Sequence, residues 1–268
     1  MTATDKIFSG SIPDIYDHYL VPLIFEPYAQ DLAARIAGAK PRAVLETAAG
    51  TGVLTRALAS RLPESVRIVA TDLNQPMLDQ AAKQSQGTRV VWQQADALTL
   101  PFEDQSFDIV ACQFGAMFFP DKIQGYREAR RVLKPSGHFH FNVWDEISTS
   151  EFADVVTSAL AEMFPQDPPR FLARTPHGYR DPDQIREQLT AAGFAKISIE
   201  VVDHRSRAPS PRHPALAYCQ GTPLRNEIEA RDGSRLEEAT NKAANAIASR
   251  FGSGAVDGRI RALVISAA

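Results

Sequence analysis

Short apolar runs rich in β-branched residues alternate with segments of helical spacing from residue 42 onward. Pro76 stands near the start of one such segment, where a helix tolerates proline. Strands this apolar need helices on both faces of their sheet. The alternation therefore predicts an α/β protein with a doubly wound, mostly parallel sheet. Its first five strands are expected at residues 43–47, 67–72, 89–96, 107–114 and 138–144.

The alternation loosens after residue 144. Helices are expected at residues 150–164 and 183–192, and two more strands at 196–204 and 259–266, which brings the sheet to seven strands. A mostly helical insertion separates the last two strands.

The front segment, residues 12–37, has helical spacing and contains three prolines, Pro13, Pro22 and Pro27. Proline inside a helix removes a hydrogen bond and clashes with the preceding turn. We therefore expect hinged helical pieces here rather than one long rigid helix.

Charge and cysteine content indicate which partners and which compartment to expect. The chain has 29 Lys and Arg against 32 Asp and Glu, a formal net charge of −3, which does not favour a nucleic-acid or anionic-membrane binder. Two cysteines without CxxC spacing fit a reducing compartment. No export signal is recognised, and no stretch approaches the ~18 apolar residues of a membrane span. We expect a cytoplasmic protein with a small-molecule partner; an oligomeric state is not predicted.

Three local patterns have ordinary explanations. The basic residues at 205, 207 and 212, with His204 and His213, are expected in a solvated loop. His138 and His140 share a strand face, but no third metal ligand is spaced near them, so no metal site is expected. Cys112 lies in an apolar strand and is expected to be a buried, inert thiol.

The turn after the first strand contains Gly50 and Gly52, which let the backbone approach a ligand and turn sharply into a helix. A dinucleotide fingerprint, G-x-G-x-x-G, would need a third glycine where Thr55 stands, or Val53 when counted from Ala48. A P-loop would need a lysine that is absent from this turn. Both phosphate-binding patterns therefore fail.

With these residues and four later stretches, the chain resembles the class I S-adenosylmethionine-dependent methyltransferases, in the branch of ubiquinone and menaquinone biosynthesis methyltransferases. The family's first motif, acid-x-G-x-G-x-G, runs here from Glu46 to Gly52, with Ala48 in place of the first glycine. The resemblance covers residues 42–145, and residues 181–194 resemble the family's final helix. The later motifs match residues 70–78, 93–102, 107–115 and 131–139.

The resemblance implies S-adenosylmethionine as cofactor and gives each motif residue a role. Asp72 would accept both ribose hydroxyls, and Leu73 and Met77 would flank the adenine. Asp96 would accept the adenine amino group, while the main chain of Ala97 donates to the ring. Both aspartates have an alternative role as helix N-caps.

Around the methionine moiety, Glu46 would face the ammonium group through water. The end of the fourth strand would lie beside the sulfonium, where carbonyl oxygens and an aromatic face favour positive charge. The remaining residues of the implied cofactor site are Ala48, Gly50 and Gly52 in the loop, Leu98 near the adenine, and Cys112, Gln113 and Phe114 at the fourth strand.

These expectations describe one domain over residues 1–268, with a cofactor-binding core at 42–145 and helical cap segments at 1–37, 146–180 and 206–257. The expected function is methyl transfer to a small organic acceptor by in-line attack. The alternatives are a nicotinamide-dependent oxidoreductase, disfavoured by Thr55 and Val53, and a non-catalytic binding protein with this fold.

The acceptor and the catalytic residue are not predicted. In the aromatic cluster of Tyr16, Tyr19, Phe25 and Tyr28, core packing and a role of Tyr16 or Tyr19 in the acceptor site are equally favoured. Candidates for a general base are His18, His177 and Tyr179.

Overall fold

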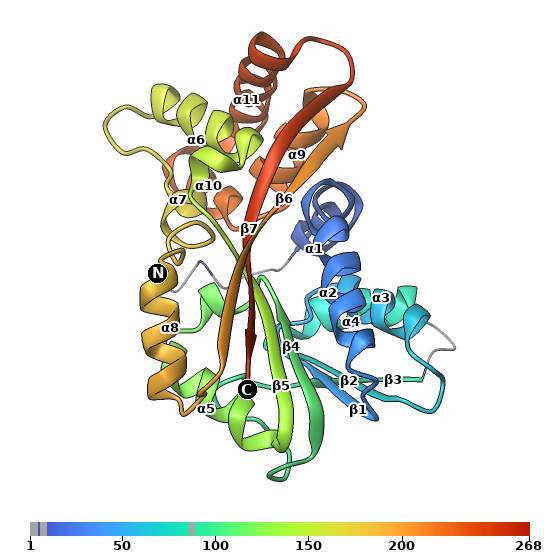
Figure 1. Cartoon of the computed structure of the whole chain (residues 1–268). Helices are drawn as coiled ribbons and strands as arrows, with labels where there is room; N and C mark the ends of the chain where they lie inside the picture. Colours follow the sequence, from blue (N-terminus) through green and yellow to red (C-terminus); the bar gives the residue numbers. More distant parts are fainter. Residues whose placement is uncertain (1–4, 6–9, 86–88) are drawn as a thin grey trace. The chain divides into compact units, whose positions relative to one another are not determined.

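The computed structural model describes residues 5, 10–85 and 89–268 (Figure 1). Residues 1–4 and 6–9 of the expected front cap, and residues 86–88, lie outside the described residues.

The described residues contain one seven-stranded sheet with the order β3-β2-β1-β4-β5-β7-β6, which confirms the expected fold class. The first five strands are parallel. Main-chain groups of Lys196 and Ala268 bond each other while Asp203 pairs with Arg261, so β6 and β7 are antiparallel. The strands are β1 Ala43–Glu46, β2 Arg67–Asp72, β3 Val90–Gln94, β4 Phe107–Gln113, β5 Leu133–Trp144, β6 Ile197–Ala208 and β7 Val256–Ala267.

The chain divides into two compact units. The sheet unit comprises Pro27–Val143, Arg180–Val202 and Ala262–Ala268, and the helix-rich unit comprises Met1–Glu26, Trp144–Tyr179 and Asp203–Arg261. Residues 27–37, which we expected in the cap, belong to the sheet unit.

The longer helices of the sheet unit are α2 Glu26–Gly38, whose first residue lies in the other unit, α3 Val53–Arg61, α4 Gln75–Gln84, α5 Lys122–Val132 and α8 Pro182–Ala191. The helices of the helix-rich unit are α1 Ile12–Ile15, η2 Tyr16–Phe25, η4 Ile147–Thr149, α6 Glu151–Met163, α7 Phe171–Arg174, α9 Arg212–Gln220, α10 Leu224–Asp232, η5 Gly233–Arg235 and α11 Leu236–Phe251. One more 3-10 turn, η3, spans Ala116–Phe118.

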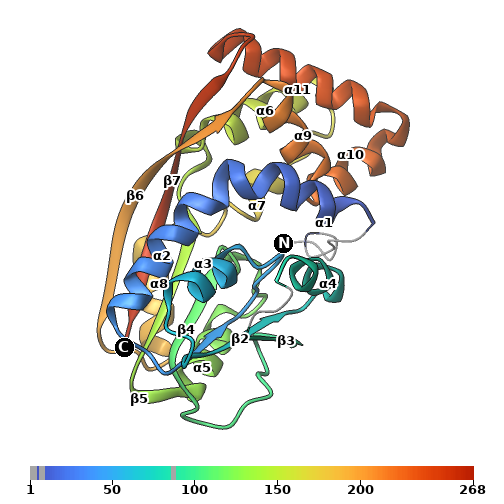
Figure 2. The same cartoon turned by 90° about the vertical axis from the view of Figure 1, so that its right-hand side faces the viewer.

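Helices cover both faces of the sheet (Figure 2). Leu32 of α2 and Leu58 of α3 pack in one cluster with Val44 and Ile109 of the sheet, and all four are at most 1% exposed. On the other face, the Tyr126 ring of α5 lies 5.3 Å from the ring of Phe141. Burial on both faces explains why the strands are nearly continuous apolar runs.

Residues 12–38 are helical throughout, in the successive elements α1, η2 and α2, so the prolines do not interrupt the helical run. Pro13 stands in the first turn, which tolerates it. Pro22 lies inside η2, a ten-residue π-helix, whose N–H groups bond the carbonyl five residues back. The N–H of Glu26, for example, bonds the carbonyl of Val21. The run accommodates proline because this register does not use the i−4 carbonyl with which the proline ring clashes.

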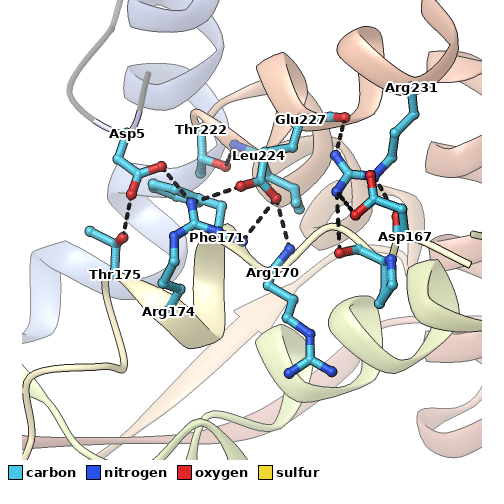
Figure 3. Close-up of polar contacts among 11 residues, drawn as sticks. Asp5, Asp167, Arg170, Phe171, Arg174, Thr175, Thr222, Leu224, Glu227 and Arg231 are labelled. Carbon is cyan, nitrogen blue, oxygen red and sulfur yellow. Dashed lines mark hydrogen bonds and ion pairs between the residues drawn. The ribbon is translucent and has the colours of Figure 1, made fainter. Parts of the chain in front are cut away.

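Within the helix-rich unit, the Glu227 carboxylate of α10 caps α7 (Figure 3). It accepts the N–H groups of Arg170 and Phe171 at 2.7 and 3.1 Å, which a helix terminus otherwise leaves unsatisfied. It also accepts the Arg174 guanidinium at 2.7 Å, and Arg174 in turn reaches the buried Asp5 at 2.6 Å. One carboxylate therefore stabilises a helix start and an ion-pair chain.

We expect Glu227→Ala to lower the free energy of unfolding by about 2 kcal/mol, because it removes the acceptor of two backbone N–H groups and one of the two ion-pair partners of the half-buried Arg174 guanidinium. Glu229→Ala, on the same helix, removes only the exposed i,i+4 pair with Arg225 and should cost less than about 0.5 kcal/mol. Urea midpoints of both variants measure this difference; equal midpoints would contradict the capping role.

Candidate cofactor-binding site

Three residues of the loop after β1 have a left-handed backbone conformation. Ala48, Gly50 and Gly52 have φ of +52°, +57° and +81°. Glycine adopts this region freely, whereas alanine pays roughly 1–2 kcal/mol. The backbone of position 48 thus suits the glycine that the resembled motif has there.

Main-chain bonds fix this loop between two strands. The N–H of Thr47 bonds the carbonyl of Ala111 on β4, and the N–H of Ala49 bonds that of Thr71 on β2, each at 2.9 Å. The loop thus starts where β1 lies between β4 and β2, at the carboxyl ends of parallel strands. This is the topological switch point, where open α/β sheets bind ligands.

Gly52 is required by packing. A Cβ there would lie 2.5 Å from the Trp92 ring of β3 and 3.3 Å from Ala81 of α4. The glycine thus admits a side chain from the neighbouring strand, which differs from the close ligand approach that we expected.

Asp72 ends β2 and is 7% exposed. Its Oδ2 accepts the N–H of Gly50 and its Oδ1 that of Asn74, both at 2.8 Å. Burial raises the pKa of Asp72, and the N–H groups of Asn74 and Gly50 oppose that rise. The N-cap of α4 is Asn74, so Asp72 does not take its alternative role.

The two residues expected at the adenine are placed differently. Leu73 is 46% exposed, whereas Met77 is only 4% exposed. An exposed leucine directly after Asp72 offers apolar surface at the sheet edge, while Met77 packs inside the sheet unit.

Glu46 is buried at the end of β1, with 1% exposure, and accepts the hydroxyl of Thr55 at 2.5 Å. Burial raises the pKa of the Glu46 carboxyl to about 8, against the opposing effects of Thr55 and Arg56. At pH 7 this carboxyl therefore carries a proton in the free protein.

Asp96 is exposed and closes a turn. Its Oδ1 accepts the N–H of Leu98 at 2.9 Å and its carbonyl that of Thr99 at 3.0 Å. A turn follows here, not a helix, so the N-cap alternative does not apply. Half-buried Ala97 and Leu98 lie in this turn, and the bond from the N–H of Ala95 to the carbonyl of Asp72, at 3.0 Å, ties its start to β2.

The end of β4 contacts the loop. Cys112 is fully buried and burial raises the pKa of its thiol to about 12, which confirms the inert thiol. Gln113 and Phe114 are 8% and 5% exposed, and Phe114 has φ of +50°. A Cβ on Gly115 would lie 2.4 Å from the Cβ of Ala48, so the turn after β4 packs directly on the loop.

Tyr16 and Tyr19 lie in η2 of the helix-rich unit and are half-buried. Tyr16 stacks on Phe25 with ring centroids 5.1 Å apart, and Tyr19 meets His213 edge-on at 4.9 Å. Tyr28 instead lies in the sheet unit, edge-on to Phe114 at 5.3 Å. A role of the two tyrosines in acceptor binding stays a prediction.

The three base candidates differ in burial. His18 is exposed, while His177 and Tyr179 are each 5% exposed. The Nδ1 of His177 lies 2.7 Å from the carbonyl oxygen of Asp145. Because a carbonyl only accepts, this Nδ1 carries a proton and the neutral ring has its lone pair at Nε2.

The other local patterns are explained by structure. His140 bonds Ser266 at 2.8 Å and burial lowers its pKa to about 4. The described part of the chain holds no group of three or more possible metal-binding side chains. Arg205 and Arg207 lie on β6, where both pair with Asp257; the solvated loop was therefore wrong for them. None of the helices among the described residues has the length and apolarity needed to cross a membrane.

Four residues that shape this edge were missed in the sequence. Thr55 donates a hydrogen bond to Glu46, and Asn74 donates one to Asp72. Asn142 accepts the N–H of Phe114. The Oγ1 of buried Thr51 has no partner among the described residues. Thr51 alone had a local signal, its place between two glycines.

The comparisons with known proteins agree with this geometry. A family model described as a methyltransferase domain matches residues 44–137. A demethylmenaquinone methyltransferase from Lactobacillus johnsonii is 32% identical over 168 residues, covering 58% of this chain and 68% of that protein. The chain belongs to the class I S-adenosylmethionine-dependent methyltransferases. Their cofactor, S-adenosylmethionine, is therefore the cofactor of this enzyme.

Two further known proteins are similar to this methyltransferase. A ubiquinone/menaquinone biosynthesis C-methyltransferase UbiE from Hahella chejuensis is 33% identical over 164 residues, covering 56% of this chain and 66% of that protein. The crystal structure of the [4+2]-cyclase SpnF has a TM-score of 0.59 at 18% identity, covering 90% of this chain and 80% of that chain. The latter likeness shows the fold alone. The oxidoreductase alternative gains no support from these similarities.

The residues of the methyltransferase fit its cofactor. An anchored carboxylate beside an exposed leucine suits a ribose and an adenine, and a buried carboxyl at β1 suits an ammonium group. The hydroxyl of Thr51, which has no partner in the part of the chain that the structure describes, is a further polar group for a ligand to satisfy.

We expect Ala48→Gly to raise the free energy of unfolding of the methyltransferase by about 1 kcal/mol, because it removes the left-handed penalty at position 48. Ala49→Gly, one residue later and not left-handed, should instead lower it by about 1 kcal/mol. Urea unfolding compares the two; a destabilised Ala48→Gly variant would contradict the strain at this position.

Proposed function

We propose that this methyltransferase methylates a ring carbon of a small reduced quinone. The names of its relatives support this substrate class, because they act on demethylmenaquinone or are C-methyltransferases of ubiquinone and menaquinone biosynthesis. The reduced, hydroquinone form is required because its ring carbon is electron-rich, whereas the quinone ring is electrophilic.

The proposed cofactor site uses the groups at the carboxyl edge of the sheet. Asp72 accepts the two ribose hydroxyls, and Leu73 covers the adenine. Asp96 accepts a hydrogen bond from the adenine amino group, and the main chain of Ala97 donates one to the ring. Leu98 lies beside them. The observation that carries this assignment is the Asp72 carboxylate, which is fixed at the edge of the sheet: its Oδ2 accepts the N–H of Gly50, and its Oδ1 accepts the N–H and, at 3.4 Å, the side-chain amide of Asn74. A ribose hydroxyl would take the place of the long amide contact at Oδ1.

Glu46 and the loop hold the amino-acid end of the cofactor, and the turn after β4 lies at its sulfonium. Bound S-adenosylmethionine supplies an activated methyl group. The chain therefore mainly positions the two reactants and excludes water. Met77 supports the adenine site from inside the core.

A base takes the hydroxyl proton of the hydroquinone, which makes the ring carbon more nucleophilic. Methyl transfer would release S-adenosylhomocysteine, and the methylated ring carbon would then lose its own proton, which restores the aromatic ring. His177 suits this role because its bond to Asp145 places the lone pair at Nε2. Within the helix-rich unit its ring lies 6.0 Å from that of Trp144, which lies 5.9 Å from that of Phe25, and all three side chains are buried.

The same proposal places the activity in the cytoplasm, without a nucleic-acid partner. Both cysteines are free, buried thiols, which suits a reducing compartment. The arginines of the local basic stretch are engaged by Asp257 and Glu237.

We expect Asp72→Asn to weaken S-adenosylhomocysteine binding at least tenfold. A hydrogen bond to a charged group contributes about 1.5–3 kcal/mol, and the amide replaces one acceptor by a donor. Asp79→Asn, an exposed aspartate on α4, is the control and should bind normally. Isothermal titration calorimetry measures both; unchanged affinity of Asp72→Asn would overturn the site assignment.

We expect cofactor binding to release a proton from Glu46 near pH 7. The free carboxyl has a pKa of about 8, and a nearby cation lowers it. Affinity for S-adenosylmethionine should therefore rise with pH up to about 8 and then level off. Calorimetry in two buffers of different ionisation enthalpy counts the protons. Glu46→Gln should lose this release; an identical release in the variant would contradict the role of Glu46.

A further inference from the structure

We propose that Asn142 is a positioning residue that sets the enzyme's preference for the cofactor's positive sulfonium, acting through the main chain of Phe114. The inference rests on the proposed function, since it gives Asn142 a task at that same site. Asn142 stands on β5, next to Gln113 in the β4–β5 register, and its side chain is 0% exposed.

Asn142 holds the turn after β4 with two oxygens. The N–H of Phe114 lies 3.0 Å from the Oδ1 of Asn142 and 3.2 Å from its carbonyl oxygen. Phe114 has φ of +50°, a conformation that a bulky residue keeps only when its surroundings enforce it. The side-chain amide is one of the groups that enforce it.

The turn also contacts the loop after β1 and Cys112. A Cβ at Gly115 would lie 2.4 Å from the Cβ of Ala48 and 2.8 Å from the Sγ of Cys112. The Sγ of Cys112 also accepts the N–H of Gly115. Asn142 and the loop therefore fix the carbonyl groups of the turn together.

The Phe114 ring is buried in the core of the sheet unit. It is 5% exposed and meets Tyr28 edge-on at 5.3 Å. Tyr28 is itself fully buried, and its hydroxyl donates to the carbonyl of Val202 at 3.0 Å. The groups that the turn offers to a sulfonium are therefore carbonyl dipoles, whose direction depends on the backbone that Asn142 holds.

Folding alone does not favour an asparagine at position 142. The Nδ2 of Asn142 is buried without a partner among the described residues, and an unsatisfied buried donor costs stability. Leucine has the same branching at Cγ without the polar atoms, and with leucine the Phe114 N–H would keep the main-chain carbonyl of residue 142. A functional need for the Oδ1 contact explains why the amide is present.

The test titrates the whole enzyme with S-adenosylmethionine and with S-adenosylhomocysteine, which lacks the sulfonium charge. Asn142→Leu should keep its affinity for S-adenosylhomocysteine within about twofold and lose about tenfold for S-adenosylmethionine. Asn142→Asp, assayed at pH 6, should keep the wild-type ratio of the two affinities, because burial keeps this carboxyl protonated and its oxygen still accepts from Phe114.

Ser266→Ala is the matched control, since it removes a buried side-chain bond from His140, another β5 residue on the same face. It should leave the ratio unchanged. An unchanged ratio in Asn142→Leu, or an equal loss for both ligands, would overturn the positioning role. Wild-type enzyme that binds neither ligand would overturn the proposed site itself, a result distinct from either of these.

Discussion

The hydrogen bond from the N–H of Gly50 to the carboxylate of Asp72, 2.8 Å long, joins the loop after β1 to the end of β2. It depends on the parallel register of these strands, which sets Glu46 beside Ala70 and so brings both strand ends to one edge. The bond orients the one carboxylate that suits a ribose, and it requires the left-handed backbone at Gly50. This one hydrogen bond therefore fixes both the conformation of the loop and the position of the Asp72 carboxylate.

Several energetically unfavourable features lie at this same edge of the sheet. Ala48 and Phe114 are left-handed residues without the freedom of glycine, and they belong to the two turns that pack together at Gly115. Glu46 is a carboxyl whose burial raises its pKa to about 8, and the buried Nδ2 of Asn142 has no partner among the described residues. Each of these costs stability, and they cluster at the edge where we propose that the cofactor binds.

The sequence predicted the five parallel strands because buried parallel strands are apolar runs, and β2 has the expected bounds, residues 67–72. It misplaced the start of β5 at His138. Pairing of Leu133 with Phe107 extends the strand back through Pro135 and Gly137. The sequence also led us to expect separate helical pieces at the three prolines of residues 12–37, because the rule for proline assumes the α-helical register that η2 does not use.

The candidate site was predictable only where a local motif marks it. The motifs of the family that the chain resembles pointed to Glu46 and Asp72, which end β1 and β2, and to Gly50 in the loop after β1. The reason for Gly52 is a tryptophan forty residues later in the chain, and the Asn142 contact depends on the β4–β5 register. Such contacts between distant segments leave no local pattern.

Amide hydrogen exchange of the intact enzyme, with and without saturating S-adenosylhomocysteine, tests the central claim most directly. The loop after β1, the end of β2 and the turn after β4 should form one binding site, so the cofactor product should slow exchange at residues 49–52 and 113–116 together. Exchange in α6 and α11 should stay unchanged. Unchanged exchange at residues 49–52 under saturating ligand would contradict the account.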